Sequence, residues 1–271
     1  MKGGTAASLW RRAWPPALAG LVGVASLPLV ILPTLEALMG AGRAPTHSLA
    51  LLAALSLVQP ALLVLVAAFA GAALAPALGF TSYLARTNVR TPWAAQLRSA
   101  IASGLVVGVV IVALDIALFR GFALRPIGAQ PLRGILQTLA GGLLYGGLSE
   151  EVMMRFGLMT FVVWLGARLL GRTTAGETAS AATRPGSAAL PAPLFGIAIV
   201  VVALVFAAGH LPAAAAVAPL TAALVLRILL LNAVAGLVFG WLYWKASLEA
   251  AMLAHASVHV VFAIAQYLGW S

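Results

Sequence analysis

The chain has 271 residues, of which 63% are hydrophobic and only 8% are charged, and its formal net charge is +10 at pH 7. Soluble domains carry about a quarter charged residues, so this composition excludes an ordinary soluble fold. Apolar runs of about 20 residues or more, without alternation, predict membrane-spanning α-helices and exclude a β-barrel. The arginines stand singly or in small groups near the ends of these runs, which is typical of contact with lipid headgroups, so we do not expect nucleic-acid binding. Without cysteine, the chain has no disulfide, no thiolate nucleophile and no Cys-ligated metal.

The apolar runs predict an all-α, polytopic transmembrane bundle of about seven to eight helices. The first run follows Lys2, Arg11 and Arg12, and its length favours a retained anchor over a cleaved signal peptide. Asp115 stands alone in the third run and is expected to be bonded within the bundle. The fourth run is too long for one simple span and predicts either a very long helix or two pieces joined near its glycines. The runs are residues 17–39, 49–80, 99–119, 132–170, 194–209, 220–245 and 248–268.

The loops carry a charge pattern that bears on orientation. Residues 171–193 are rich in Thr, Ala, Ser and Pro and predict an extramembrane loop. The positive-inside rule places this loop, the N-terminus and the loop with Arg86 and Arg90 in the cytoplasm. The loop with Arg120, Arg125 and Arg133 then falls on the opposite side, so either one segment is re-entrant or the count of spans is off by one.

Two adjacent acidic residues, Glu150 and Glu151, lie inside an otherwise apolar run. An ionisable residue within a membrane helix is costly, so it usually faces the bundle interior, has a partner and serves a function. Arg155 follows Glu151 by four residues, which predicts an ion pair on one helix face. Adjacent helical residues point about 100° apart, so Glu150 is left free to face a cavity. Gly146 and Gly147, one turn earlier, are expected to leave room there for water or a substrate backbone.

Three of the four histidines lie in the last apolar regions. His210 ends one run, and His255 and His259 share one face of the final run because they are four residues apart. A glutamate with nearby histidines can deprotonate water and stabilise the oxyanion that forms when this water attacks an amide. Taken singly, the ion pair and each histidine also fit structural links between helices. An unpaired glutamate together with three histidines, spread over several helices, favours a catalytic site.

These residues resemble the motifs of the CAAX prenyl protease and bacteriocin-processing family, the Abi or CPBP membrane proteins. Residues 150–155, EEVMMR, are similar to the EExxxR motif of that family. Phe206 to His210, FAAGH, is similar to its second motif, FxxxH, and His255 with the residue at 259 is similar to its third, HxxxN. Order and spacing agree over residues 132–268, about half of the chain, and three motifs in order on apolar helices are fairly specific.

The resemblance implies an intramembrane endopeptidase of the glutamate type that needs no cofactor. It implies that Glu150 and His210 activate water, and that His255 and His259 stabilise the oxyanion. In eukaryotic members the substrate is a prenylated protein C-terminus that loses its last three residues. The residues implied to support the site are Glu151, Arg155 and Phe206.

One position departs from the family pattern, because His259 stands where the family commonly has Asn. A histidine also binds metal, so one alternative is a zinc-dependent membrane hydrolase with His210, His255 and His259 as ligands and Glu150 as base. A second alternative is a non-enzymatic immunity-type or transport-type membrane protein with a polar midplane site. The expected partners are membrane lipid and a protein or peptide substrate cleaved near its C-terminus, with or without a lipid group.

The sequence predicts two regions of the chain and a location in the cell. Residues 1–131 are predicted to form N-terminal transmembrane helices, and residues 132–271 a catalytic helical core that includes the 171–193 loop. Arginine strongly outnumbers lysine, and alanine is abundant, which is typical of a prokaryote with a GC-rich genome. We therefore expect an integral protein of the bacterial inner (cytoplasmic) membrane.

Overall fold

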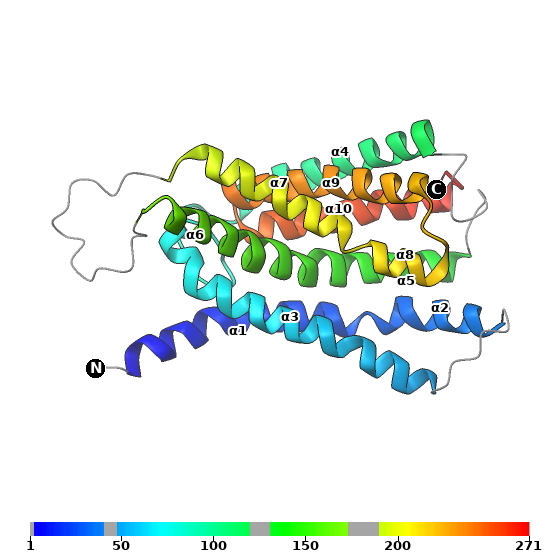
Figure 1. The fold of residues 1–271 in the computed structure, drawn as a ribbon, viewed down its shortest axis with the longest axis horizontal. Helices are drawn as coiled ribbons and strands as arrows, with labels where there is room; N and C mark the ends of the chain where they lie inside the picture. The colour runs from blue at the N-terminus through cyan, green and yellow to red at the C-terminus, as the bar shows by residue number, and fades with distance from the viewer. Residues whose placement is uncertain (1–2, 41–47, 120–130, 173–189, 271) are drawn as a thin grey trace.

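The backbone of a long apolar chain must satisfy its hydrogen bonds internally, and in this chain it does so as helix. The computed structural model describes residues 3–40, 48–119, 131–172 and 190–270 (Figure 1). Seven helices in these residues are long and apolar enough to cross a membrane, which confirms the predicted all-α polytopic bundle. The elements are α1 (Gly3–Ala25), α2 (Pro28–Gly40), α3 (Leu49–Leu78), α4 (Ala94–Phe119), α5 (Leu132–Gly141), η2 (Gly142–Glu150), η3 (Val152–Met159), α6 (Thr160–Leu169), α7 (Ala192–Ala208), α8 (Leu211–Val217), α9 (Ala222–Lys245) and α10 (Leu248–Tyr267).

The first span is interrupted, whereas the sequence predicted one run over residues 17–39. It begins earlier, at Ser8, and reaches Pro33. A tight turn separates α1 from α2, where Ser26 Oγ donates to Gly23 O at 2.7 Å. Pro28 then starts α2, a position that tolerates proline because the first turn of a helix needs no N–H donor.

The fourth span settles the choice between one long helix and two pieces. Residues 132–169 form a single continuous run, α5–η2–η3–α6, and its middle has wider π-helical turns. In one of these turns a side chain adds a hydrogen bond, because Thr160 Oγ1 donates to Arg155 O at 3.3 Å. Short π-helical segments are frequent at functional sites. Glu150 and Glu151 lie at the junction of the two π-helical segments, halfway along the span.

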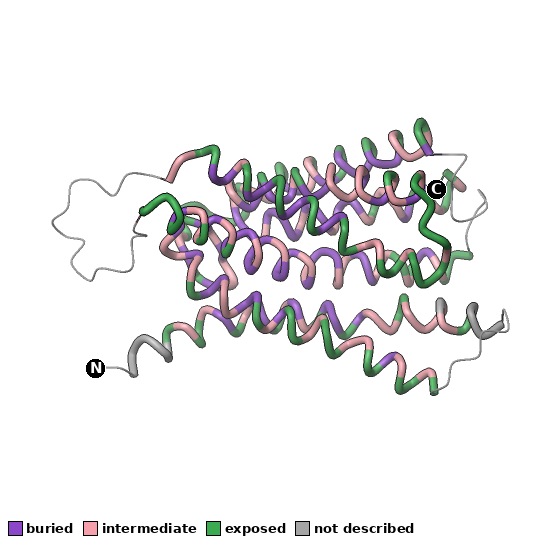
Figure 2. Tube along the Cα trace, in the orientation of Figure 1, coloured by how far each residue is buried: buried purple, intermediate pink, exposed green. Residues whose placement is uncertain are grey.

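The fourth and last spans form the centre of the bundle. Figure 2 shows buried residues concentrated on these helices, and large exposed apolar side chains line the outer faces of α3, α4 and α7, as lipid contact requires. α4 packs on α9 and α10, α7 packs on α9, and α1 and α3 cover η2 and η3. Close approach depends on small residues, since a Cβ on Gly157 would overlap Ala67 and one on Gly104 would overlap the backbone of Ala254.

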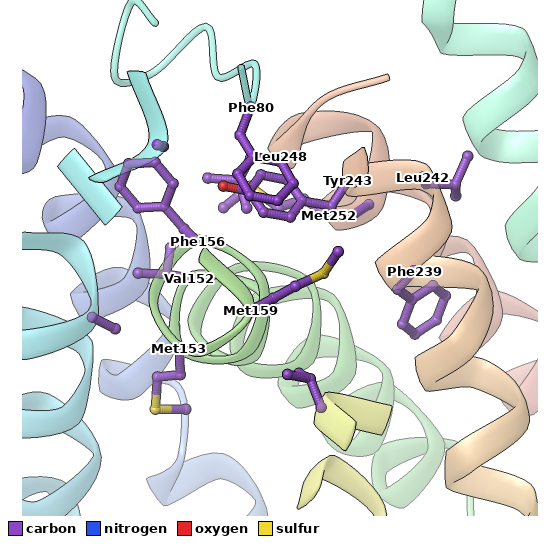
Figure 3. Packing of buried hydrophobic residues seen from close by; sticks show 14 of the residues in the cluster. Phe80, Val152, Met153, Phe156, Met159, Phe239, Leu242, Tyr243, Leu248 and Met252 are labelled. Carbon is purple, nitrogen blue, oxygen red and sulfur yellow. The ribbon is translucent and has the colours of Figure 1, made fainter. Parts of the chain in front are cut away.

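An aromatic and methionine core fills the space beside the fourth span. Phe156 points from η3 toward α3, and Met159 points to the other side, toward Met252 and Phe239 (Figure 3). Tyr243 stacks on Phe80 with ring centroids 4.4 Å apart, and its hydroxyl is 2.8 Å from Thr160 Oγ1. The packing fixes α9 against the helix that carries Glu150 and Glu151.

The seven spans cross the bundle in alternating directions, which determines the end of the bundle at which each loop lies. The N-terminal end of α1, residues 79–93 and the end of α6 lie at one end of the bundle, and α8 and the C-terminus lie at the other (Figure 1). No re-entrant segment is needed among the described spans, because the connection between α4 and α5 simply joins the far end. Arg120, Arg125 and residues 173–189 of the predicted 171–193 loop lie outside the described residues.

Candidate active site

The predicted ion pair in the fourth span is present. Arg155 Nη1 lies 3.1 Å from Glu151 Oε1, and both side chains are fully buried. Arg155 also donates from Nη2 to Gly236 O in α9 at 3.1 Å. Its guanidinium lies over the rings of Phe206 and Phe239, 5.0 and 5.4 Å from their centroids. Arg155 therefore links the fourth span to both α7 and α9.

His255 connects the two glutamates. Its Nδ1 is 2.8 Å from Glu151 Oε1, and because an ionised carboxylate can only accept, Nδ1–H is the donor. Its Nε2 lies 3.7 Å from Glu150 Oε2. The ring is stacked on Phe239 at 4.6 Å, so both hydrogen bonding and packing fix its orientation. Glu151 thus has two partners, Arg155 and His255, whereas the sequence predicted only the first.

His210 is held by the backbone at the end of α7. Its Nδ1 is 2.9 Å from Phe206 O, and since a carbonyl only accepts, Nδ1 carries the proton in this contact and Nε2 is left with a lone pair. The Phe206 ring meets the rings of His210 and His255 edge-on, at 4.8 and 5.9 Å. Phe206 therefore touches both histidines and Arg155, in keeping with the supporting position that the resemblance implied.

His259 packs against the glycine-rich part of the fourth span. Its ring stacks on His255 at 5.3 Å and fills the groove that Gly142 and Gly146 leave. A Cβ on Gly146 would come within 2.9 Å of His259 Nε2 and 3.0 Å of His255 Nε2, and one on Gly142 would overlap the His259 ring. Gly147 faces the α10 backbone near Ala256 instead. The expectation that these glycines leave room for water or substrate was wrong for Gly147, which packs on α10, whereas Gly146 lines the cavity beside Glu150 and the two imidazole rings.

A cavity of about 610 Å³ brings the predicted working residues together. Glu150, His210, His255 and His259 all line it, and Phe206 lies beside them. Glu151 and Arg155 are absent from the lining, so the two adjacent glutamates occupy different environments. The Glu151 side chain is fully buried, whereas that of Glu150 is 18% exposed. In the described part of the chain, no hydrogen bond or ion pair joins Glu150 to His210, and the two face the cavity from separate helices.

The cavity wall also contains an ion pair that the sequence analysis missed. Asp115 of α4 is bonded to Arg227 of α9 by two contacts, Nε to Oδ1 at 2.5 Å and Nη2 to Oδ2 at 2.6 Å. This confirms that Asp115 is bonded within the bundle and identifies its partner. Arg227 stands inside the 220–245 apolar run, so the rule that drew attention to Glu150, the cost of a charge inside a span, also points to it. Tyr145 and Asn232 of the wall carry no such signal.

The histidines that could hold zinc do not form a ligand set here. Among the residues described, no group of three or more His, Cys, Asp or Glu side chains is placed to hold a metal ion. His255 and His259 stack face to face with an interplanar angle of 16°, and Nδ1 of both His210 and His255 is already engaged. The zinc alternative stays a prediction that metal analysis must test.

Comparison with known proteins identifies one family. The family described as "Type II CAAX prenyl endopeptidase Rce1-like" matches residues 132–261, the segment from α5 to α10 that contains all three motifs. This confirms the resemblance to the CAAX protease family. No curated protein matches the chain. No solved structure matches it either.

Proposed function

Because the chain carries the Rce1-like region of the CAAX prenyl protease family over residues 132–261, we propose that it is an intramembrane endopeptidase that cleaves near the C-terminus of a protein or peptide. The observation that supports this most is the convergence of Glu150, His210 and His255 on one cavity within the membrane spans. A peptide bond bound there meets a carboxylate that can act as a base and imidazoles that can donate. The seven spans make the chain an integral membrane protein, and membrane lipid is therefore a partner.

The proposed reaction begins with a water molecule between Glu150 and His210. Glu150 takes one proton from this water, while the lone pair on His210 Nε2 accepts a hydrogen bond from it and orients it. The hydroxide attacks the peptide carbonyl carbon, and the carbonyl oxygen becomes an oxyanion. The tetrahedral intermediate collapses when Glu150 returns the proton to the leaving amine. All atoms come from the peptide and one water, so the step needs no cofactor.

The histidines of α10 are proposed to stabilise the oxyanion. His255 is held through Nδ1–H by Glu151, so its Nε2 points to Glu150 and the cavity. The proton that Glu150 takes from water can pass to Nε2, 3.7 Å from Glu150 Oε2; Nε2–H then donates to the oxyanion, and the proton returns through Glu150 to the leaving amine. His259 supplies a second donor from the same helix face. Donors that are fixed before the reaction stabilise the developing charge most effectively, which is why Glu151 and Arg155 are proposed as positioning residues.

The proposal is tested with purified protein in detergent or nanodiscs and a set of peptides with known C-termini. We expect release of a short C-terminal fragment by the wild type and a loss of about 10²-fold to 10⁴-fold in Glu150→Gln, the range typical of a missing acid–base group. Glu36→Gln is the matched control, because Glu36 is exposed on α2. Wild-type turnover in Glu150→Gln contradicts the mechanism. Absence of cleavage, together with a protection or transport phenotype that Glu150→Gln removes, favours the non-enzymatic alternative.

We further propose that the cavity opens on the side of the membrane away from the cytoplasm. Its lining extends to Phe119 at the end of α4, Thr138 near the start of α5 and Trp270 after α10, which all lie at the C-terminal end of the bundle. The basic residues gather at the other end. They are Arg11, Arg12, Arg86, Arg90, Arg98, Arg168, Arg172 and Lys245, against Arg133 and Arg227 at the cavity end of the described spans.

With the basic residues of the remaining connections included, ten Lys and Arg residues fall at the basic end and five at the cavity end. Lys2 and Arg184 belong to segments attached to the basic end, and Arg43, Arg120 and Arg125 to connections that join the cavity end. An excess of Lys and Arg marks the cytoplasmic side. In the bacterial cytoplasmic membrane, which we propose as the location, the substrate is then a chain end presented at the outer face. A cytosolic prenylated protein is not required as substrate.

A further inference from the structure

The Asp115–Arg227 pair lies in the wall of the same cavity, but it takes no part in the chemistry proposed above. It joins α4 to α9, and the two side chains are 17% and 23% exposed. A charge pair within membrane spans is costly and is usually kept for a function. The polar lining at this end of the cavity also includes Thr138, Asn232 and Gln266. The pair is therefore the centre of a second polar region in an otherwise apolar cavity.

The geometry of the pair leaves one edge of the guanidinium unused. Asp115 binds the edge formed by Nε and Nη2. A guanidinium has five N–H donors, and among the described residues Nη1 of Arg227 has no hydrogen-bond or ion-pair partner. The edge formed by Nη1 and the second N–H of Nη2 matches the two oxygens of a carboxylate. Asp115 therefore orients Arg227 without blocking it for a second anion.

Distance along α9 relates this edge to the proposed cleavage point. Phe239, which stacks on His255, follows Arg227 by twelve residues, so the two lie about 18 Å apart along the helix axis at 1.5 Å per residue. An extended peptide advances about 3.3–3.6 Å per residue, and the guanidinium itself shortens the gap. A chain of about three to five residues then covers the distance from the cleaved bond to Arg227. Ile111, Leu231 and Phe262 line the cavity between the two regions and suit apolar side chains.

We propose that Arg227, oriented by Asp115, binds the C-terminal carboxylate of the substrate and so sets the distance from the chain end at which the bond is cleaved. This inference rests on the proposed peptidase function. It assigns the substrate a free α-carboxylate and a short apolar C-terminal segment. It also explains why an ion pair stands in the cavity wall, away from the glutamate and the histidines and close to apolar residues such as Ile111 and Leu231.

The test compares two peptides that differ only in a C-terminal carboxylate or carboxamide. We expect the wild type to favour the acid by about 10-fold to 100-fold in kcat/KM, the range for a hydrogen-bonded charged group. In Arg227→Gln, KM for the acid rises until the preference disappears, whereas kcat and the turnover of the amide change little. Arg227→Lys keeps part of the preference because it keeps the charge but loses the planar fork.

Asp115→Asn separates recognition from a structural tie between α4 and α9. If the pair acts only as a tie, Asp115→Asn and Arg227→Gln impair the acid and the amide alike. If Arg227 binds the carboxylate, Asp115→Asn keeps or increases the preference for the acid, because a competing negative charge is removed. Equal turnover of acid and amide by the wild type overturns the inference and leaves the peptidase proposal intact. If neither peptide is cleaved, the proposed function fails, and binding of the two fluorescent peptides to the protein still measures the preference.

Discussion

The Glu151→Gln substitution is the sharpest test of the proposal that Glu151 positions His255 whereas Glu150 acts as the base. The substitution keeps the volume of the side chain and an acceptor for His255 Nδ1–H, but it removes the counter-ion of Arg155. Arg155 is fully buried, and removing one partner of a buried ion pair costs about 3–5 kcal/mol because a charge is left uncompensated. For a chain of this size, that corresponds to a fall in Tm of roughly 6–20 °C. The loss should spread to α7 and α9, because Arg155 also contacts Phe206 and Gly236.

Thermal unfolding in detergent provides the measurement, with Glu150→Gln as the matched isosteric control. Glu150 is partly exposed to the cavity, and among the described residues its one ion-pair contact is to His255 at 3.7 Å, so we expect its substitution to change stability by less than about 1 kcal/mol while it lowers cleavage strongly. The double variant Glu151→Gln/Arg155→Met removes both charges and should recover at least half of the lost stability. An equal fall in Tm for the two single variants, or no fall in Glu151→Gln, refutes the assignment of Glu151 as the positioning residue and Glu150 as the base.

Three further predictions concern His259, the glycines and the orientation. His259→Asn is expected to retain activity within about tenfold, because a carboxamide also donates N–H; loss of activity together with stoichiometric zinc from the wild-type protein would instead favour the zinc hydrolase. Gly142→Ala should cost about 1–3 kcal/mol and lower kcat, since the new methyl group overlaps the His259 ring. Gly134→Ala in the same helix has open space and should be neutral or slightly stabilising, so an equal effect of both on Tm and kcat would count against this packing. Because the chain has no cysteine, a membrane-impermeant maleimide added to intact cells should label Gln266→Cys and not Val89→Cys. The reverse pattern would place the cavity on the cytoplasmic side.

Most of what the sequence could predict about the site follows from the spacing of residues along a single helix. The Glu151–Arg155 ion pair follows from the i,i+4 geometry of one helix, which holds whatever surrounds the helix. Membrane spans follow in the same way from the length of apolar runs. The hydrogen bond from His255 to Glu151 joins residues 104 positions apart, and it depends on how α10 packs against the fourth span. No pattern within a single helix encodes that packing.

The glycines illustrate why the side chains that fill a space between helices were harder to predict than the partners of buried charges. Glycine in a helix indicates close approach, but it does not say what approaches. Near Gly142 and Gly146 the neighbour is the His259 ring, and near Gly147 it is α10 itself. Arg227, in contrast, was open to prediction, because a lone cation in a span needs a nearby anion, and Asp115 is the acid in the third apolar run.

Adjacent carboxylates with different surroundings are what a glutamate-type mechanism requires. Arg155 and His255 both contact Glu151 Oε1, so Glu151 suits the role of a fixed anchor for His255. Glu150 turns away from Arg155, reaches the cavity and lies next to an imidazole nitrogen, where a proton can be taken up and returned. One residue step along a helix is therefore enough to separate the anchor from the base. A variant that exchanges their surroundings, by moving the cation toward position 150, should fold and lose cleavage.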